Sequence, residues 1–171
     1  MEPVVPGRDD AGMDFTVSNA ATVDAPSAQL FALITDVDRL PAWNAEIVRV
    51  IDRPDTLEPG GVWVVEMHAL HNRWNSRSRV LDLDPERGRF SYRSQTDDGN
   101  PSYADWHWVV TPEGSGTRVQ VTVDAHPRSF WRKVLLSRIR RRSLQPAMDA
   151  SLRALAEQVT AEEADDQAGL A

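Results

Sequence analysis

The 171-residue sequence contains no cysteine. This excludes a disulfide, a thiolate nucleophile and a thiolate metal site. No apolar run approaches the ~20 residues that a helix needs to cross a bilayer. The N-terminal segment has neither the basic region nor the apolar stretch of a signal peptide. On this basis we expect a cytoplasmic protein.

Basic side chains are in the minority, with 19 Lys and Arg against 26 Asp and Glu, for a net charge of -7. Because nucleic-acid phosphates require a basic surface, nucleic acid is not an expected partner. The sequence also lacks a phosphate-binding loop, a dinucleotide fingerprint and a Gly-x-Ser-x-Gly motif, so no cofactor is expected. The apolar fraction of 41% is typical of a globular domain.

The longest apolar-periodic segment, residues 129–160, predicts the helix around which the rest of the chain is organised. Pro146 has no N–H, so we expect a kink or short break there, with Ser143 as the candidate cap of the second half. At 3.6 residues per turn, one narrow sector of this helix is apolar. The sector contains Phe130, Val134, Leu144, Met148, Leu152, Leu155 and Val159.

Before this helix, strand signals alternate with turn signals. Residues 15–23 predict a half-buried strand, and short helices are expected from Asp24 to Val37 and over Arg39–Trp43. The turns between the six later strands are short, as between antiparallel neighbours. These strands are Ile47–Arg53, Val62–Ala69, Arg73–Leu83, Arg89–Thr96, Tyr103–Thr111 and Thr117–Ala125.

This order of elements predicts an α+β helix-grip fold. A seven-stranded antiparallel sheet wraps around the long C-terminal helix, and two short helices lie between strands 1 and 2. Residues 14–160 form one domain, because no linker divides them. Residues 1–13 and the acidic tail 161–171 lack periodicity and are predicted to be disordered.

Several motifs resemble the SRPBCC superfamily, also known as START-like or Bet v 1-like, and within it the polyketide cyclase/dehydrase-like group. They are residues 23–44 (VDAPSAQLFALITDVDRLPAWN), residues 59–61 (PGG), residues 105–106 (DW) and residues 116–119 (GTRV). The resemblance covers residues 14–160. It implies a deep cavity between sheet and helix that receives hydrophobic ligands, with Trp43 at its rim. The superfamily includes ligand binders, lipid carriers and aromatase/cyclases, so a shared fold does not name the reaction.

Alternation along each strand assigns its side chains to an inner or an outer face. The inner faces of most strands are apolar and rich in tryptophan, whereas the fourth and fifth add three serines and a tyrosine as polar groups. The side chains expected to line the cavity are Trp43, Trp63, Met67, Trp74, Ser76, Ser78, Tyr92, Ser94, Trp106, Trp108 and Met148.

The predicted inner faces carry no charged acid/base pair, which argues against catalysis. Tyr92 is a candidate for orienting a ligand carbonyl, although we interpret it first as a lining residue. His107 and His68 lie on the outer face in this register, and become candidate bases only if the register shifts by one. The spacing of His68 and His71 straddles a strand end and lacks a second ligand pair, so no metal site is predicted.

Basic residues gather at the start of the long helix, where seven of the 19 lie within residues 128–142. A solvated helix face is the simplest interpretation. A second one is weak, salt-dependent contact with an anionic membrane through Arg138, Arg140, Arg141 and Arg142. In a third, these arginines pair with nearby acids and the protein forms a homodimer through Trp131, Leu135 and Ile139.

The leading hypothesis is a binding or carrier protein for a hydrophobic small molecule, whether aromatic, polyketide-like or lipid. The alternative is a polyketide aromatase/cyclase that catalyses aldol cyclisation and dehydration. A catalyst must place a titratable group inside the cavity, and this requirement separates the two.

Overall fold

The computed structural model describes residues 14–129 and 137–169. Seven strands form one antiparallel sheet in the order β1-β7-β6-β5-β4-β3-β2. They are β1 (Phe15–Val23), β2 (Ile47–Asp52), β3 (Val62–Ala69), β4 (Asn72–Asp84), β5 (Arg89–Thr96), β6 (Tyr103–Glu113) and β7 (Gly116–His126).

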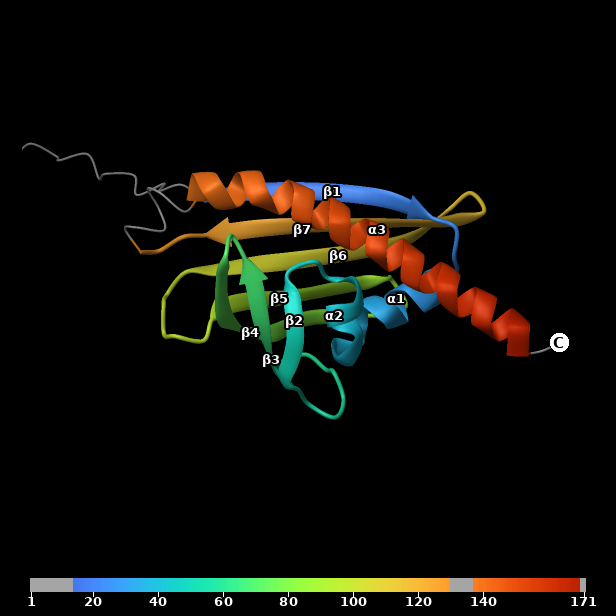
Figure 1. Cartoon of the computed structure of the whole chain (residues 1–171), viewed down its shortest axis with the longest axis horizontal. Helices are drawn as coiled ribbons and strands as arrows, with labels where there is room; N and C mark the ends of the chain where they lie inside the picture. Colours follow the sequence, from blue (N-terminus) through green and yellow to red (C-terminus); the bar gives the residue numbers. More distant parts are fainter. Residues whose placement is uncertain (1–13, 130–136, 170–171) are drawn as a thin grey trace, which may run out of the picture.

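Helices cover one face of this sheet. Between β1 and β2 lie α1 (Ser27–Thr35), the 3₁₀ turn η1 (Val37–Arg39) and α2 (Leu40–Trp43), and α3 (Ser137–Gly169) follows the last strand. In Figure 1, α3 runs obliquely from beside the start of β1 and the end of β7, past α1, toward the C-terminus. The predicted α+β helix-grip fold is confirmed.

The apolar sector of α3 packs into the core. Leu144, Met148, Leu152, Leu155 and Val159 are all buried. Phe130 and Val134, which the periodicity placed in the same sector, lie outside the described residues, as do Trp131, Leu135 and residues 1–13.

The long helix differs from the sequence prediction at two places. It continues through Pro146 without a break, and the Ser143 hydroxyl donates to the Arg140 carbonyl rather than capping a new helix. The buried side chains of Leu144 and Met148, two residues before and after Pro146, hold the backbone helical despite the missing hydrogen bond. The helix also runs to Gly169, through residues predicted to be disordered. Ala, Glu and Gln are good helix formers, and no Gly or Pro interrupts them before that residue.

The predicted strand faces are also found. Val119, Val121 and Val123 of β7 point inward and are at most 1% exposed. On the outer face, Arg93 of β5 donates to Asp105 of β6 through Nε at 2.7 Å and Nη2 at 2.8 Å. A bulge in β4 between Val80 and Asp82 shifts its pairing with β5.

None of the helices in the described part of the chain is both long and apolar enough to span a membrane.

Truncating the buried face of α3 tests this packing. We expect Leu152→Ala and Leu155→Ala each to lower the free energy of unfolding by ~2–4 kcal/mol, because each leaves a cavity in the core. The exposed neighbour Arg153 is the matched control, and Arg153→Ala should stay within about 0.5 kcal/mol of the parent. Chemical denaturation measures all three. Equal losses at Leu152 and Arg153 would contradict the orientation of α3.

Candidate functional site

A hollow of about 440 Å³ lies between the inner face of the sheet and the start of α3. Its walls come from β1 and from β3 to β7, including both sides of the β3–β4 turn, and from the first turns of α3. The apolar and aromatic residues that line it include Phe15, Met67, Leu70, Trp74, Trp106, Val123 and Leu144.

Five of the eleven side chains predicted to line a cavity do line this hollow: Met67, Trp74, Ser76, Ser94 and Trp106. The other six do not contribute to its walls. Trp43, Trp63, Ser78, Trp108 and Met148 are buried in the packed interior, and Tyr92 is partly buried beside them. The ligand contacts of all eleven stay a prediction.

Aromatic side chains fill the part of the interior that the sequence assigned to the cavity. The Trp63 and Tyr92 ring centroids are 5.0 Å apart, and Tyr92 stacks on Trp106 at 6.0 Å with only 9° between the planes. Deeper in, Trp43 of α2 meets Trp108 edge to face at 5.5 Å. These contacts leave Trp106 as the last ring of the row, with the hollow beyond it.

Trp106 and two of the lining serines, Ser76 and Ser94, have fixed hydrogen bonds. The Trp106 Nε1–H donates to Ser94 Oγ at 2.9 Å, and Ser94 Oγ donates to the Ala104 carbonyl at 3.4 Å. Ser76 Oγ donates to the Gln95 carbonyl at 3.3 Å. Both hydroxyl protons are therefore engaged, and the serines offer mainly lone pairs to a ligand.

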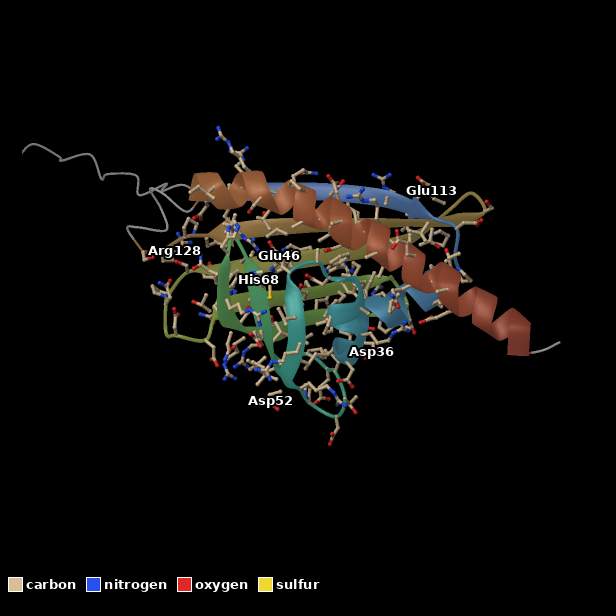
Figure 2. All side chains as sticks on the ribbon, in the orientation of Figure 1. Asp36, Glu46, Asp52, His68, Glu113 and Arg128 are labelled. Carbon is tan, nitrogen blue, oxygen red and sulfur yellow. The ribbon has the colours of Figure 1, made fainter. Side chains whose placement is uncertain are left out.

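A charged pair whose acidic member the sequence did not identify lies at the α3 side of the hollow. Arg140 lines the hollow, and both of its Nη atoms donate to the carboxylate of Glu46, which precedes β2. The Glu46 side chain is only 11% exposed, so the pair is largely withdrawn from water. Figure 2 shows Glu46 and His68 toward the end of the molecule where α3 begins, and Arg128 at that end.

The rim of the hollow carries a second group that sequence reasoning missed. His126 stacks on Tyr103 with centroids 4.6 Å apart, and both residues line the hollow. His126 Nδ1 lies 2.8 Å from Asp14 Oδ2. His126 is the last residue of β7, and alternation with the inward Val121 and Val123 places its ring on the outer face of the sheet. Its pairing with Asp14 joins residues 112 apart in sequence.

The other histidine candidates lie elsewhere. His107 is on the outer face of β6, with Nε2 3.5 Å from Asp124 Oδ2, and His68 is exposed at the end of β3. Both positions agree with the predicted register. Over residues 14–129 and 137–169, no three His, Cys, Asp or Glu side chains gather in a metal-binding arrangement.

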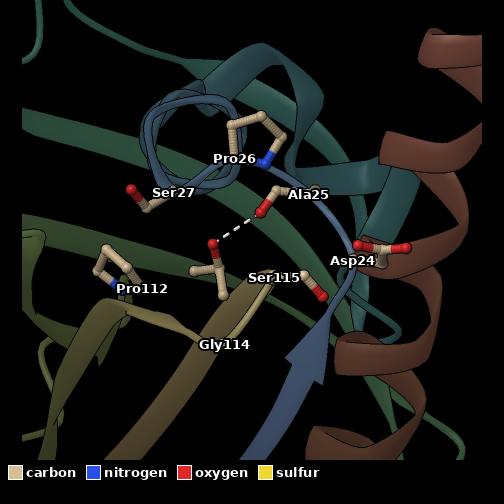
Figure 3. A pocket seen from close by; sticks show the side chains of 9 residues that line it. Asp24, Ala25, Pro26, Ser27, Pro112, Gly114 and Ser115 are labelled. Atoms are coloured by element: carbon tan, nitrogen blue, oxygen red, sulfur yellow. Dashed lines mark hydrogen bonds between the residues drawn. The ribbon is translucent and has the colours of Figure 1, made fainter.

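A second hollow lies at the opposite end of the sheet, between the start of α1 and the β6–β7 turn (Figure 3). Its walls are mainly loop and turn residues, and its buried Thr117 hydroxyl already donates to the Ala25 carbonyl at 2.7 Å. A Cβ at Gly116 would lie 2.5 Å from the Val23 carbonyl oxygen, so the turn there has a structural reason for its glycine. The residues that line this second hollow include no aromatic side chain, so the first hollow remains the candidate site.

Comparison with known proteins places the chain in a family. Residues 14–160 match the family described as polyketide cyclase/dehydrase and lipid transport. The chain belongs to this family. Among curated protein sequences, none matches it.

Solved structures of low sequence identity share the family's fold. The Zhui aromatase/cyclase from Streptomyces sp. R1128 is 18% identical with a TM-score of 0.73, over 86% of this chain and 94% of that one. TTHA0849 from Thermus thermophilus is 22% identical with a TM-score of 0.69, over 86% and 99%. Ara h 8.0201 is 16% identical with a TM-score of 0.67, over 86% and 99%. At these identities the likeness establishes the fold alone.

In this member of the family, Tyr92 sits next to the hollow in an apolar setting. Burial among its aromatic neighbours raises the pKa of the Tyr92 phenol above its ordinary 10.0, and a hydrogen bond with Trp108 opposes the shift only in part. The phenol therefore stays protonated well into the alkaline range.

This shift predicts a specific loss of stability at high pH. The unfolded chain releases the Tyr92 proton near pH 10, whereas the folded protein retains it, so stability falls as pH rises above about 10. Tyr92→Phe removes this contribution. We expect the free energy of unfolding of the parent to fall relative to that of Tyr92→Phe between about pH 9 and about pH 11, by urea denaturation. A difference that does not change with pH would contradict the burial of the phenol.

Proposed function

We propose that this protein binds, and serves as a carrier for, a hydrophobic small molecule with a flat ring system. The observation that carries this proposal is the hollow of about 440 Å³ with Trp74 and Trp106 among its lining residues. Its volume is in the range of small-molecule sites, roughly 300–1,000 Å³.

The composition of the walls favours a ligand that is apolar over most of its surface. Indole rings present large apolar faces, and aromatic ligands stack on them with additional attraction. Trp106 is well suited to this contact, because Tyr92 backs its ring and Ser94 holds its N–H. A ligand meeting this wall encounters a ring whose orientation is already set, which lowers the entropy lost on binding.

The polar groups favour binding over chemistry. The Arg140 guanidinium is held by Glu46, and the hydroxyl protons of Ser76 and Ser94 are engaged by backbone carbonyls. These groups can orient ligand oxygens or hydroxyls, but none of them is a free base next to the aromatic wall. Selective, reversible binding is the function that this arrangement supports best.

A cyclase is the second candidate, and His126 is the observation that favours it. Its Nδ1 faces the Asp14 carboxylate at 2.8 Å, which is how a carboxylate orients an imidazole whose other nitrogen acts as a base. His126 is among the residues that border the hollow, although its ring stacks on Tyr103 on the outer side of the sheet. For this candidate function, the imidazole would have to rotate toward the hollow to act on a ring-closing aldol condensation and dehydration.

Filling the hollow tests the binding proposal. Ala104 lines the hollow, and we expect Ala104→Leu to weaken binding of a neutral polycyclic dye by at least about tenfold, because the added side chain occupies ligand space. Ala32 on α1 is exposed, so Ala32→Leu is the matched control and should leave affinity unchanged. Quenching of tryptophan fluorescence reports binding.

Removing the aromatic wall is a second test of the site. Trp106→Ala should weaken binding of the dye by roughly tenfold as well. Unchanged affinity in both Ala104→Leu and Trp106→Ala would contradict the proposed site.

His126 separates the two candidate functions. If the protein is a carrier, His126→Gln should retain dye affinity within about twofold, since the dye contacts the aromatic wall. If it is a cyclase, the same variant should lose roughly 10²–10⁴-fold in the rate of conversion of a poly-β-ketone chain to its aromatic product. Product formation is followed by absorbance. Turnover by the parent that is lost in His126→Gln would replace the carrier with the cyclase.

A further inference from the structure

The turn between β3 and β4 has an unusual composition for its geometry. Ala69 pairs with Asn72, and the two residues between them, Leu70 and His71, have φ angles of 51° and 64°. Two consecutive left-handed residues make a tight hairpin turn, for which Asn and Gly are the usual choice. A leucine is strained at such a position, so the backbone does not explain its presence.

Packing does not explain this leucine either. Leu70 is 44% exposed, at the rim of the hollow. Ile139, in the first turns of α3, is 43% exposed and lies next to Arg140, which lines the same hollow. The hairpin and the start of α3 lie at the same end of the molecule in Figure 1. Two large apolar side chains at this end therefore face solvent, Leu70 at the rim of the hollow and Ile139 in the first turn of α3.

Three consecutive arginines near the start of α3, Arg140 to Arg142, divide into two groups. Arg140 turns inward and pairs with Glu46, so it is not available to a partner. Arg141 and Arg142 are exposed, and neither forms an ion pair with any residue that the structure describes. Each residue of a helix is rotated by about 100° from the one before, so Arg141 and Arg142 point away from the side of α3 on which Arg140 lies.

The other charges at this end are mostly balanced. Arg73 and Arg49 share the single carboxylate of Glu66, which leaves one positive charge in excess. Arg128 is opposite Asp14. The rim also contains Asp98, whose carboxylate accepts from the Thr96 hydroxyl and the Asn100 N–H. The opening is thus locally basic, although the chain carries a net charge of -7.

We propose that this end of the protein docks on an anionic lipid bilayer. The docking surface, here called the mouth patch, consists of Leu70, His71, Ile139, Arg141 and Arg142. Leu70 and Ile139 enter the interfacial region, while Arg141 and Arg142 face the lipid head groups. Contact is transient, because two arginines and two apolar side chains fall short of a stable anchor. Docking in this way turns the opening of the hollow toward the bilayer. An apolar ligand then passes from the bilayer into the hollow, or back, without crossing water.

Co-sedimentation with vesicles tests the charge contribution. We expect the full chain to bind vesicles of phosphatidylcholine mixed with phosphatidylserine at low salt. Binding should disappear with phosphatidylcholine alone and at about 1 M salt, where the Debye length is about 3 Å. The double variant Arg141→Glu and Arg142→Glu should lower the partition coefficient at least about tenfold. Arg79→Glu with Arg118→Glu is the matched control, because it changes net charge equally at exposed residues of β4 and β7 and should have a much smaller effect.

A second pair of variants tests the apolar contribution. Leu70→Ser with Ile139→Ser should lower the partition coefficient about tenfold, since both side chains lose contact with the bilayer. The matched control is Leu81→Ser with Ile51→Ser, which makes the same two replacements at side chains 42% exposed on β4 and β2. Trp106→Ala should bind vesicles like the parent although it binds the dye more weakly. A failure of the docking proposal is therefore distinguishable from a failure of the proposed ligand site.

Three outcomes would overturn the proposal. The first is no sedimentation of the parent at low salt. The second is an equal loss in the Arg141 and Arg142 double variant and in its charge-matched control, which would assign binding to overall charge. The third is a dimer by light scattering that dissociates on Leu70→Ser with Ile139→Ser, which would show that a second copy of the chain covers the mouth patch.

Discussion

The contact between α3 and the inner face of the sheet is the interaction that holds the other elements in place. An antiparallel sheet of this kind has one apolar face, and only the helices are available to cover it. Leu155 of α3 and Val119 of β7 reach 0% exposure on the two sides of this interface. The short helices depend on it too, since the Ala45 N–H, just after α2, donates to Ser151 Oγ of α3 at 3.1 Å.

This interface is closed at one end and hollow at the other. Where α1 and α2 lie under α3, Trp43 and Trp108 fill the space between helix and sheet. Toward the start of α3 there is no comparable filling among the residues that the structure describes, and the row of rings ends at Trp106. The packed end supplies burial and the hollow end supplies space, so one helix serves both stability and binding.

The packed end has one polar exception, because the buried Trp43 Nε1 has no hydrogen-bond partner among the described residues. Burying such a group without a partner costs about 1–3 kcal/mol, which the large apolar surface of the indole offsets at this position.

Charged side chains are confined mostly to the outer face of the sheet. There Glu66 accepts hydrogen bonds from Arg49 and Arg73, and these bonds lower the pKa of the Glu66 carboxyl. The pairs are exposed and contribute little stability each. Their effect is on specificity, because a charged outer face ensures that the sheet packs α3 on one side only.

Local patterns in the sequence were sufficient to predict the fold and the strand faces, whereas the depth of the site and the charges that reach it depend on tertiary contacts. Alternation with a period of two set the inward direction of the β7 valines, and the helical period set the buried direction of Leu152 and Leu155. Alternation assigns Tyr92 and Trp106 to one face alike, but whether a ring lines a hollow or packs on another ring depends on distances across several strands. Likewise, Arg140 belongs to a basic run in sequence, and it became an internal group because folding brings Glu46, 94 residues away, within hydrogen-bonding distance. Such pairings join distant segments, and no local period encodes them.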